Sequence, residues 1–417
     1  MTKISSVEQF LVQVPFRESV RCDMERAGIH TWSEVELTRV EADSGMVGWG
    51  ETVQNYTWRK VTDAERVVGS SPFEVMWDDS LGAGLQMALL DLAGKCAEVP
   101  IYRLFGEKCR DWCAISYWDH DMSPEHYAAE ARVAVELGYT CMKIKTRPWW
   151  DVRETVGAIS DATPGCFRID ADWNAFLNEA GTAIPVLREL EEAFPKIKMF
   201  EDPIARDDVA GNRHLRAQIK TPIAHHYGFI PPRVAVESGV CDGWILNQGA
   251  TQTLRQGATS AEMNMPFFLQ MVGTGLTTAL ALHFGSVMSR AQWPTITCHE
   301  LYDHCLLAER IPVQGGHARV PEMPGLGVQI DEDALERYRV EEANHGLPRR
   351  LIRVTRSCGI HVYFVDSRQK WIFYGHGNQP VDEWGARTEL IEDDGTPEFE
   401  ELFSRATESP VISRASD

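Results

Sequence analysis

The stretch Cys141–Thr146 reads CMKIKT and places two lysines, Lys143 and Lys145, two residues apart at the end of a short apolar run. If this stretch is a β-strand, both lysines point to the same face, because successive side chains alternate across a strand. Two neighbouring cations disfavour each other and burial disfavours both, so we expect at least one lysine to lose its proton more readily than a free lysine. Such a lysine is a candidate general base. The alternative is an edge strand with two solvated lysines.

Short apolar runs alternate with helical patterns on both sides of this stretch. The predicted strands are 113–117, 141–145, 166–170, 197–201, 222–224, 243–246, 266–270 and 295–298. The helical patterns between them are 124–137, 152–162, 179–193, 208–219, 232–237, 251–262 and 274–289. Eight strands joined by seven helices favour a closed parallel barrel over an open sheet, and in such a barrel the chemistry lies at the carboxyl ends of the strands.

Polar side chains stand at these predicted strand ends. They are Lys143, Lys145, Asp170, Asp172, Glu201, Asp202, His225, His226, Asn247, Gln270, His299 and Glu300. Lysines that face carboxylates across a barrel mouth make a site where oxygen ligands can hold a hard cation such as Mg²⁺. A solvated loop residue is the simpler interpretation for any one of them, but their shared position favours a single site.

The N-terminal region has a different pattern. Residues 4–15 and 33–51 read as strands of an antiparallel sheet, with a turn at 43–45, and residues 72–94 read as helical. The polar segment 17–30 reads as an irregular loop long enough to cover the barrel mouth. Its candidate substrate-selecting side chains, with one just beyond it, are Arg17, Arg21, Arg26, His30 and Trp32.

These segments together resemble the enolase superfamily, and more closely its mandelate racemase and muconate lactonizing enzyme branch, over about residues 1–340. The resemblance rests on GWGE at 48–51, on LQMALLDLAGKCAEVPIYRLFG at 85–106, on the barrel segments KIK, IDAD, FEDP and TPIA, and on PGLGV at 324–328. It implies an α/β fold: a modified (β/α)7β TIM-type barrel at 112–304, under an α+β capping domain at 1–111 that a return segment at 305–340 rejoins.

The resemblance also implies a reaction, in which the proton α to a carboxylate is removed and Mg²⁺ holds the resulting enediolate. Lys145 would be the base and Lys143 its electrostatic neighbour, while Asp170 and Glu201 would be metal ligands. Glu300 could donate a hydrogen bond to the substrate carboxylate. Such groups stabilise the enediolate where its charge develops.

The chain departs from this family at the third metal ligand. The family has an acidic residue at the end of the fifth strand, whereas this chain reads His225-His226-Tyr227-Gly228. Imidazole suits zinc and softer metals better than Mg²⁺, and it removes one negative charge. Three outcomes are open: Mg²⁺ held by two carboxylates and water, another divalent metal with His226 as a ligand, or no metal.

A second departure concerns the opposite face of the substrate, where the chain offers Asn247 and Gln270 in place of a second base. Neither side chain is a base at neutral pH, so one-base chemistry is favoured. An acid would then help a β-hydroxyl leave as water, and the candidates are His225, His226, Tyr227 and His299. We predict a lyase that dehydrates a sugar acid or hydroxy acid. The alternatives are an isomerase or cycloisomerase of the same superfamily, or a catalytically silent member without a metal site.

Residues 341–417 lie beyond the resemblance and read as a β-hairpin extension followed by an acidic tail. The predicted strands are 351–355, 359–365 and 371–374, with a turn at 366–369, and residues 380–408 are acidic and then polar. A hairpin rarely stands alone in water, so it must pack on the barrel or on a neighbouring subunit. We predict that it contributes to a homo-oligomer interface.

Composition limits the remaining function classes. With 417 residues, 44% of them hydrophobic, the chain can form one large domain and a smaller one. A formal net charge of −20 disfavours nucleic acid and anionic membrane surfaces as partners. The ten cysteines form no CxxC pair, no signal-peptide pattern begins the chain, and no apolar run approaches the ~18 residues of a membrane span. We expect a cytoplasmic protein with reduced thiols and a small carboxylate substrate.

Overall fold

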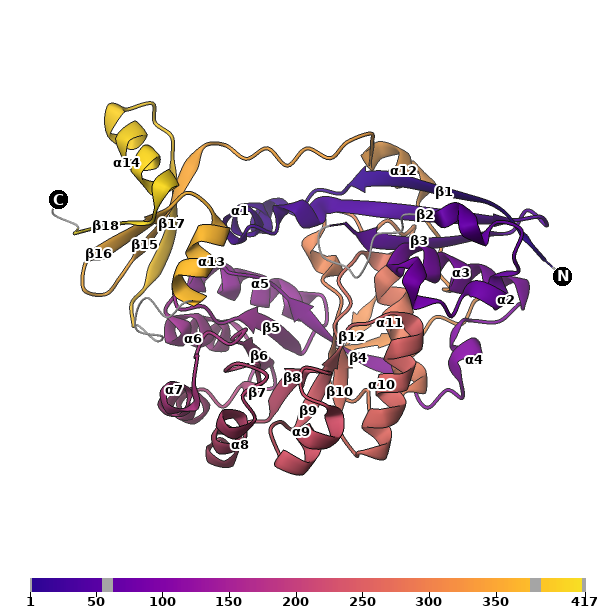
Figure 1. Ribbon diagram of the computed structural model, residues 1–417, viewed down its shortest axis with the longest axis horizontal. Coiled ribbons are helices and arrows are strands. Elements are labelled where there is room, and N and C mark those ends of the chain that lie inside the picture. The colour runs from indigo at the N-terminus through magenta and orange to yellow at the C-terminus, as the bar shows by residue number, and fades with distance from the viewer. Residues whose placement is uncertain (1, 55–62, 376–383, 415–417) are drawn as a thin grey trace.

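The centre of the molecule is a parallel β-barrel (Figure 1). The computed structural model describes residues 2–54, 63–375 and 384–414. The barrel strands are β4 (Trp112–Trp118), β5 (Cys141–Lys145), β6 (Arg168–Asp172), β7 (Ile197–Glu201), β8 (Ile223–His226), β9 (Gly243–Leu246), β10 (Phe267–Leu269) and β11 (Thr295–Ile296). The strands from β4 to β10 pair in chain order. The ring closes because β11 pairs in parallel with β4 and a bridge joins Gln270 to Ile296. The predicted barrel is confirmed.

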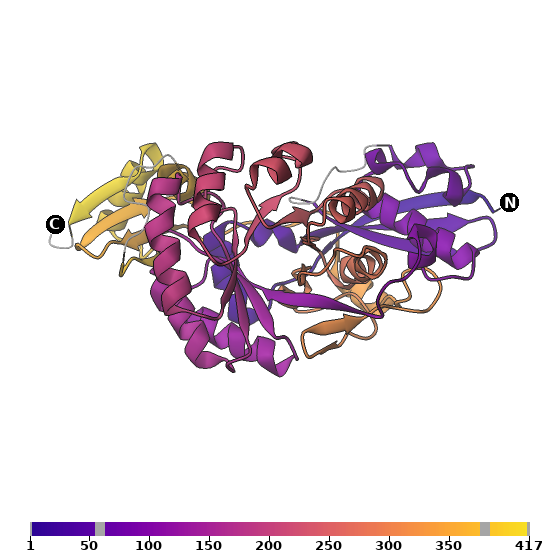
Figure 2. The same ribbon diagram turned by 90° about the horizontal axis from the view of Figure 1, so that it is seen from below.

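Helices alternate with these strands and surround the barrel, as Figure 2 shows from below. They are α5 (Pro124–Glu136), α6 (Val152–Ala162), α7 (Ala180–Ala193), α8 (Val209–Gln218), α9 (Pro232–Ser238), α10 (Ala250–Glu262) and α11 (Gly275–Val287). Three of them begin at side-chain caps, because Ser123, Asp151 and Asp208 accept hydrogen bonds from backbone N–H groups of the first turn. These caps fix the residue at which each helix begins, while the parallel pairing places the carboxyl ends of the strands at one edge.

An antiparallel sheet of β1 (Ile4–Gln13), β2 (Glu34–Ala42) and β3 (Val47–Val53) opens the chain, and β14 (Arg339–Val340) returns to pair with β1. The helix α3 (Ala83–Cys96) packs on this sheet. The predicted helix 72–94 is divided into α2 (Pro72–Val75), a 3₁₀ turn at Asp79–Leu81, and α3. A Cβ atom at Gly50 would lie 2.0 Å from the carbonyl oxygen of Gly84, so the glycine is required for this close packing.

The segment predicted as an irregular loop at 17–30 is helical, and that prediction was wrong. Residues Glu18–Ala27 form α1, and a 3₁₀ turn, η1 (His30–Ser33), follows. Val20 and Met24 lie one turn apart and are both buried, which gives the polar segment a narrow apolar face. Gly28 ends the helix in the left-handed conformation with φ 76°.

Shorter elements connect the opening sheet and the barrel. They are η2 (Ala64–Val67), α4 (Tyr102–Phe105), η4 (His299–Leu301), β12 (Val313–Gln314), β13 (His317–Arg319) and α12 (Glu332–Tyr338). Of these, β13 pairs with the start of β4. Within the described ranges, no helix combines the length and the apolar character needed to cross a membrane.

The C-terminal extension comprises residues 350–414, and its described parts, 350–375 and 384–414, form a separate sheet with two helices. Its strands are β15 (Arg350–Thr355), β16 (Ile360–Phe364), β17 (Arg387–Glu392) and β18 (Val411–Arg414), in the order β17-β15-β16-β18. Its helices are α13 (Ser367–Gly375) and α14 (Pro397–Glu408). The predicted strand at 371–374 was wrong, because these residues lie in α13, where the buried Lys370 and Tyr374 are four residues apart on one helix face.

The C-terminal extension packs on the barrel of its own chain. Trp149, Trp150 and Phe176, from the loops after β5 and β6, share a buried cluster with side chains of the extension. Those side chains are Ile352, Val354, Val362, Phe364 and Tyr374. In Figure 1 the helix α13 lies between the extension's sheet and the barrel. A contribution of the extension to a homo-oligomer stays a prediction.

Candidate functional site

A cavity of about 260 Å³ lies at the carboxyl ends of the barrel strands. The lining residues are Trp32, Trp118, His120, Lys145, Arg147, Asn174, Arg206, His226, Gln270, Val272, Ile296, Cys298 and Trp371. The cavity takes residues from the opening region, the barrel and the C-terminal extension. Among the lining residues that the structure describes, every charged side chain is basic, so the cavity suits an anionic ligand.

Lys143 is fully buried beneath this cavity. Its ammonium group forms ion pairs with Glu201 and with Asp172, the latter at 3.2 Å, and donates a hydrogen bond of 2.8 Å to Oε1 of Gln270. Burial alone would lower the pKa of Lys143, but the carboxylates of Glu201 and Asp172 raise it well above its ordinary value. Lys143 is therefore a fixed cation.

Lys145 points to the same face but reaches the cavity. Its Nζ forms an ion pair with Asp172 and donates a hydrogen bond of 3.1 Å to Oδ1 of Asn174. Burial lowers the pKa of Lys145, and the neighbouring cations Lys143 and Arg147 add to this effect against the opposing charge of Asp172. Of the two lysines, Lys145 releases its proton more readily, as the sequence led us to expect of at least one.

Asp170, the predicted metal ligand of the third strand, does not lie at the cavity. The strand β6 ends at Asp172, two residues later than predicted, and the register pairs Lys143 with Asp170 and Lys145 with Asp172. Asp172 in turn pairs with Glu201. Asp170 lines a different cavity, with Cys141, Phe268 and others, and burial raises its pKa to about 7. The structure thus brings Asp172, and not Asp170, to the level of Lys145 and Glu201.

In the part of the chain that the structure describes, one group of side chains could hold a metal ion. The ligand atoms of Glu201, Asp202 and His226 lie within 4.8 Å of one another. Oε1 of Glu201 is buried and has no hydrogen-bond partner among the described residues, so it is an unused oxygen ligand. Asp202 is less available, because it accepts hydrogen bonds from His225 (2.8 Å), His226 (2.7 Å) and Arg206 (2.7 Å). Glu201 and His226 therefore fit a divalent ion best.

The two adjacent histidines have different surroundings. Asn212 donates from Nδ2 to the carbonyl oxygens of Ala205 and Asp208, so its Oδ1 faces Nε2 of His225 at 3.0 Å as an acceptor. The two ring nitrogens of His225 thus face Oδ1 of Asp202 and Oδ1 of Asn212. These contacts hold Asp202 in place from the side away from His226.

His226, by contrast, lines the cavity. Its Nδ1 is bound to Asp202, which leaves Nε2 for a ligand. Burial lowers the pKa of His226, and Asp202 opposes this shift. The prediction that His226 belongs to the site agrees with this geometry.

His299 and Glu300 lie apart from the cavity lining. Nδ1 of His299 is 2.8 Å from Oγ1 of Thr297, and its Nε2 is 3.2 Å from Oε1 of Glu300. Glu300 also forms an ion pair with Arg310 and accepts a hydrogen bond from the Tyr139 hydroxyl. Burial alone would raise the pKa of Glu300, but His299, Arg310 and Tyr139 lower it to about 2. An ionised Glu300 has no proton to donate to a substrate carboxylate.

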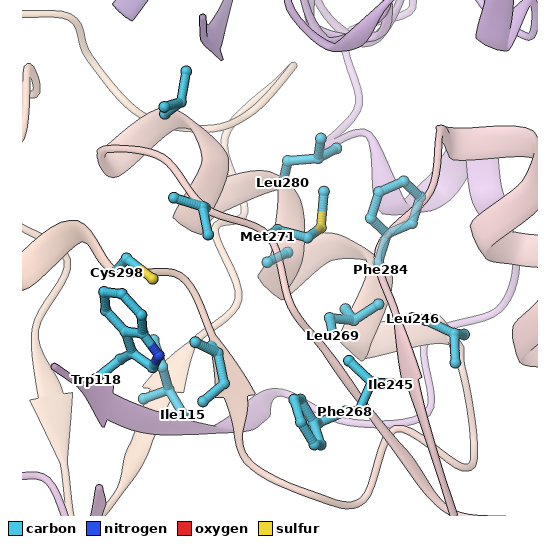
Figure 3. Close-up of a cluster of buried hydrophobic side chains, with 14 of the residues drawn as sticks. Ile115, Trp118, Ile245, Leu246, Phe268, Leu269, Met271, Leu280, Phe284 and Cys298 are labelled. Atoms are coloured by element: carbon cyan, nitrogen blue, oxygen red, sulfur yellow. The ribbon is translucent and has the colours of Figure 1, made fainter. Parts of the chain in front are cut away.

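Several lining residues were absent from the predicted site. Asn174 and Arg147 each lie two residues beyond a strand end, so the barrel pattern could have suggested them. Of the predicted substrate-selecting side chains at 17–32, only Trp32 lines the cavity, where it stacks on Trp118 at 5.8 Å. Figure 3 shows Trp118 beside Cys298 at the edge of the buried apolar cluster. No local pattern indicated Trp371, which arrives from the C-terminal extension.

Comparison with known proteins gives a consistent set of relatives. A family model described as "Enolase C-terminal domain-like" matches residues 126–334. The chain is 25% identical to D-xylonate dehydratase of Haloferax volcanii over an alignment of 357 residues that covers 73% of this chain and 85% of that protein. It is 24% identical to arabinonate dehydratase of Saccharolobus solfataricus over 349 residues, covering 73% of this chain and 91% of that protein.

The fold also has counterparts among solved structures. Muconate cycloisomerase from Pseudomonas fluorescens superimposes with a TM-score of 0.66 at 22% identity, covering 81% of this chain and 99% of that chain. N-succinyl Arg/Lys racemase from Bacillus cereus superimposes with a TM-score of 0.66 at 19% identity, covering 81% of this chain and 98% of that chain.

Proposed function

Because the chain belongs to the enolase C-terminal domain-like family, in the mandelate racemase and muconate lactonizing enzyme branch, we propose that it is a lyase that dehydrates a sugar acid or a related hydroxy acid. One observation carries this proposal. Two lysines on one strand face have pKa values shifted in opposite directions, lowered for Lys145 in the cavity and raised for Lys143 beneath it. The relatives named as dehydratases of xylonate and arabinonate supply the substrate class.

The first step is removal of the proton α to the substrate carboxylate. Lys145 accepts this proton at Nζ, while Asn174 and Asp172 hold the amine in place through the hydrogen bond and ion pair described above. The enediolate that forms carries additional negative charge. Lys143 is already charged and fixed by Glu201, Asp172 and Gln270, so it stabilises this charge without rearrangement.

A divalent ion is the second source of stabilisation in this proposal, with Glu201 and His226 as its ligands and Mg²⁺ as the candidate. When bound, it supplies a Lewis acid for the substrate carboxylate. The unused Oε1 of Glu201 supports this assignment. The histidine at the third position reduces the negative charge available to Mg²⁺, so another divalent metal is the competing candidate.

The second step is departure of the β-hydroxyl as water, and His226 is our candidate acid. With Nδ1 fixed on Asp202, a protonated His226 presents its Nε2 proton to the cavity. The same nitrogen cannot donate a proton while it binds a metal. The variant His226→Gln separates the two roles: loss of metal binding identifies a ligand, whereas retained α-proton exchange without water loss identifies the acid.

The opposite side of the cavity favours a lyase over a racemase. Its lining side chains from β10, β11 and the loops after them are Gln270, Val272, Ile296 and Cys298. Burial raises the pKa of the Cys298 thiol above its ordinary range, so this thiol is not a base at neutral pH. A racemase of the two-base type needs a second base here. With Lys145 alone, proton removal is followed by loss of a leaving group.

The experiment is a screen of sugar acids, beginning with xylonate, arabinonate and galactonate, for loss of water by mass spectrometry. Exchange of the α-proton in deuterium oxide is followed in parallel. Water loss supports the lyase, while exchange with an isomeric product and no mass change supports an isomerase or cycloisomerase. A protein that neither exchanges nor converts any acid, with divalent metal supplied, would contradict both and leave a catalytically silent member.

The homo-oligomer belongs to this proposal as well. The C-terminal extension keeps Ile412 and Trp384 exposed after it has packed on its own barrel, which gives it apolar surface for a second copy. Light scattering of the full chain and of a chain ending near residue 342 tests the idea. An unchanged assembly size after truncation would count against it.

A further inference from the structure

Among its described residues, the C-terminal extension reaches the catalytic cavity through one side chain. Trp371 of α13 lines the same cavity as Lys145 and is 41% exposed. We infer that Trp371 is a specificity-determining residue, whose indole forms the outer wall of the cavity and limits the chain length of the sugar acid. This inference rests on the proposed function for the class of substrate, but the wall itself follows from the packing of α13.

The helix α13 is anchored immediately beside Trp371. Nζ of Lys370 is buried, lies 3.1 Å from Oδ2 of Asp121 and sits 4.4 Å from the ring centre of Trp149. The other oxygen of Asp121 accepts hydrogen bonds from the indole N–H groups of Trp149 (2.6 Å) and Trp150 (2.7 Å). An ion pair with this many fixed partners holds the helix in one position on the barrel loops.

Trp371 is also connected to the catalytic base. The guanidinium of Arg147 lies 5.1 Å from the ring centre of Trp371 and 5.4 Å from that of Phe176, within the range of cation–π contacts. Arg147 donates a hydrogen bond of 2.8 Å to Oδ1 of Asn174, the same oxygen that Lys145 binds. The wall, the arginine and the base therefore form one continuous set of contacts.

Three tryptophans from distant parts of the chain contribute to the apolar surface of the cavity: Trp32 from η1, Trp118 from β4 and Trp371 from α13. Indole faces pack against the C–H groups of a carbon chain but offer one polar N–H each, so they restrict shape more than they bind hydroxyl groups. Removal of the Trp371 indole enlarges the cavity. An acid with one more carbon should then bind with a smaller loss of binding free energy.

The experiment uses the full chain and compares wild type with Trp371→Ala, Trp371→Phe and the control Ile372→Ala. Ile372 is the next residue of α13, is 44% exposed and does not line the cavity, so its removal tests loss of apolar surface alone. Circular dichroism confirms that each variant folds. Trp371→Phe keeps an aromatic wall and should resemble wild type.

The first measurement needs no substrate. Alkylation of Cys298, which lines the cavity and is otherwise buried, is followed by mass spectrometry of its peptide. We expect at least about fivefold faster alkylation in Trp371→Ala, because access limits the reaction of a buried thiol. Ile372→Ala should match wild type. An unchanged alkylation rate in Trp371→Ala would show that the Trp371 indole does not form the outer wall of the cavity.

The second measurement compares xylonate with galactonate, which is one carbon longer, by α-proton exchange and by calorimetric binding. We expect Trp371→Ala to shift the preference toward galactonate by about tenfold. Faster alkylation with an unchanged preference would overturn the specificity role. Absence of both exchange and binding in wild type would contradict the proposed function and the specificity role together. The alkylation result would still show whether Trp371 forms the outer wall of the cavity.

Discussion

The two halves of the cavity differ in charge. The half built from β5 to β8 and the loops after them contributes Lys145, Arg147, Arg206 and His226, whereas the half built from β10 and β11 contributes Gln270, Val272, Ile296 and Cys298. We call these the charged half and the neutral half. In the proposed mechanism, proton transfer is therefore confined to the side of the substrate that faces Lys145. The comparison teaches that the fate of the intermediate depends on the lack of a second base among the described residues of the neutral half, as well as on Lys145.

The two lysines of β5 repeat this contrast within a single strand. Lys143 and Lys145 share a face, yet the pKa of the first is raised and that of the second is lowered. Lys143 contacts two carboxylates, while Lys145 shares one of them and lies near Arg147. The balance of neighbouring charges, and not burial alone, assigns the two roles.

The largest expected effect comes from Lys145→Met, which removes the only base of the charged half in our proposal. We expect the rate of α-proton exchange to fall by about a thousandfold or more, the contribution of a positioned general base. Exchange is measured by NMR in deuterium oxide. Lys198→Met is the matched control, because Lys198 is an exposed lysine of β7 that does not line the cavity, and it should leave exchange unchanged. A comparable loss of exchange rate in both variants would show that the effect is not specific to the lysine in the cavity.

The next effect concerns the attachment of the C-terminal extension beside the charged half. Asp121→Asn leaves Lys370 buried without its counter-charge, so we expect a loss of roughly 3 to 4 kcal/mol in unfolding free energy. Urea unfolding measures it. Glu389→Gln removes one partner of the exposed pair with Arg353 and should cost less than about 1 kcal/mol. Equal costs would show that Asp121 does not anchor the extension.

The same ion pair predicts a pH dependence. Burial lowers the pKa of Lys370 from its ordinary 10.5 to about 8. Between these values the unfolded chain binds more protons than the folded chain, so the contribution of Lys370 to stability rises with pH, by at most roughly 3 kcal/mol. Below pH 8 the folded state carries the cost of the buried charge.

This dependence is isolated as the difference in unfolding free energy between wild type and Lys370→Met at pH 7, 8.5 and 10. The difference should move in favour of wild type as the pH increases. A difference that stays constant over this range would mean that Lys370 keeps an ordinary pKa in the folded protein.

The smallest expected effect is on Mg²⁺ affinity, and it tests how the charge of the side chain at position 226 affects metal binding. His226→Asp restores a carboxylate to the charged half, so we expect Mg²⁺ to bind about tenfold more tightly, since ligand charge tunes affinity for hard cations. Titration calorimetry measures the change. His214→Asp, on the outer helix α8, is the control and should leave Mg²⁺ affinity as it is in wild type. Weaker Mg²⁺ binding in His226→Asp would count against the proposed ligand role of position 226.

Much of the fold could be predicted from the sequence because it depends on local periodicity. The strands β5, β7 and β9 were predicted with the boundaries that the structure shows, since apolar runs between helical patterns define them. The strand prediction for residues 371–374 was wrong because aromatic residues, which favour strands, also suit the packed face of α13. In α1, only two of the buried residues are apolar, Val20 and Met24, so the helical pattern was too weak to predict.

The sequence by itself determined which face of β5 carries the chemistry, because side chains alternate with a period of two and Lys143 and Lys145 must share that face. It could not determine which of the two aspartates of β6 lies beside the base, since Asp170 and Asp172 also share a face. Only the pairing of Lys145 with Asp172 brings the second aspartate to that lysine. Nor could it bring Trp371 to the barrel mouth. That contact joins segments far apart in the chain, and it is decided by the packing of α13 on Asp121 and the tryptophans after β5.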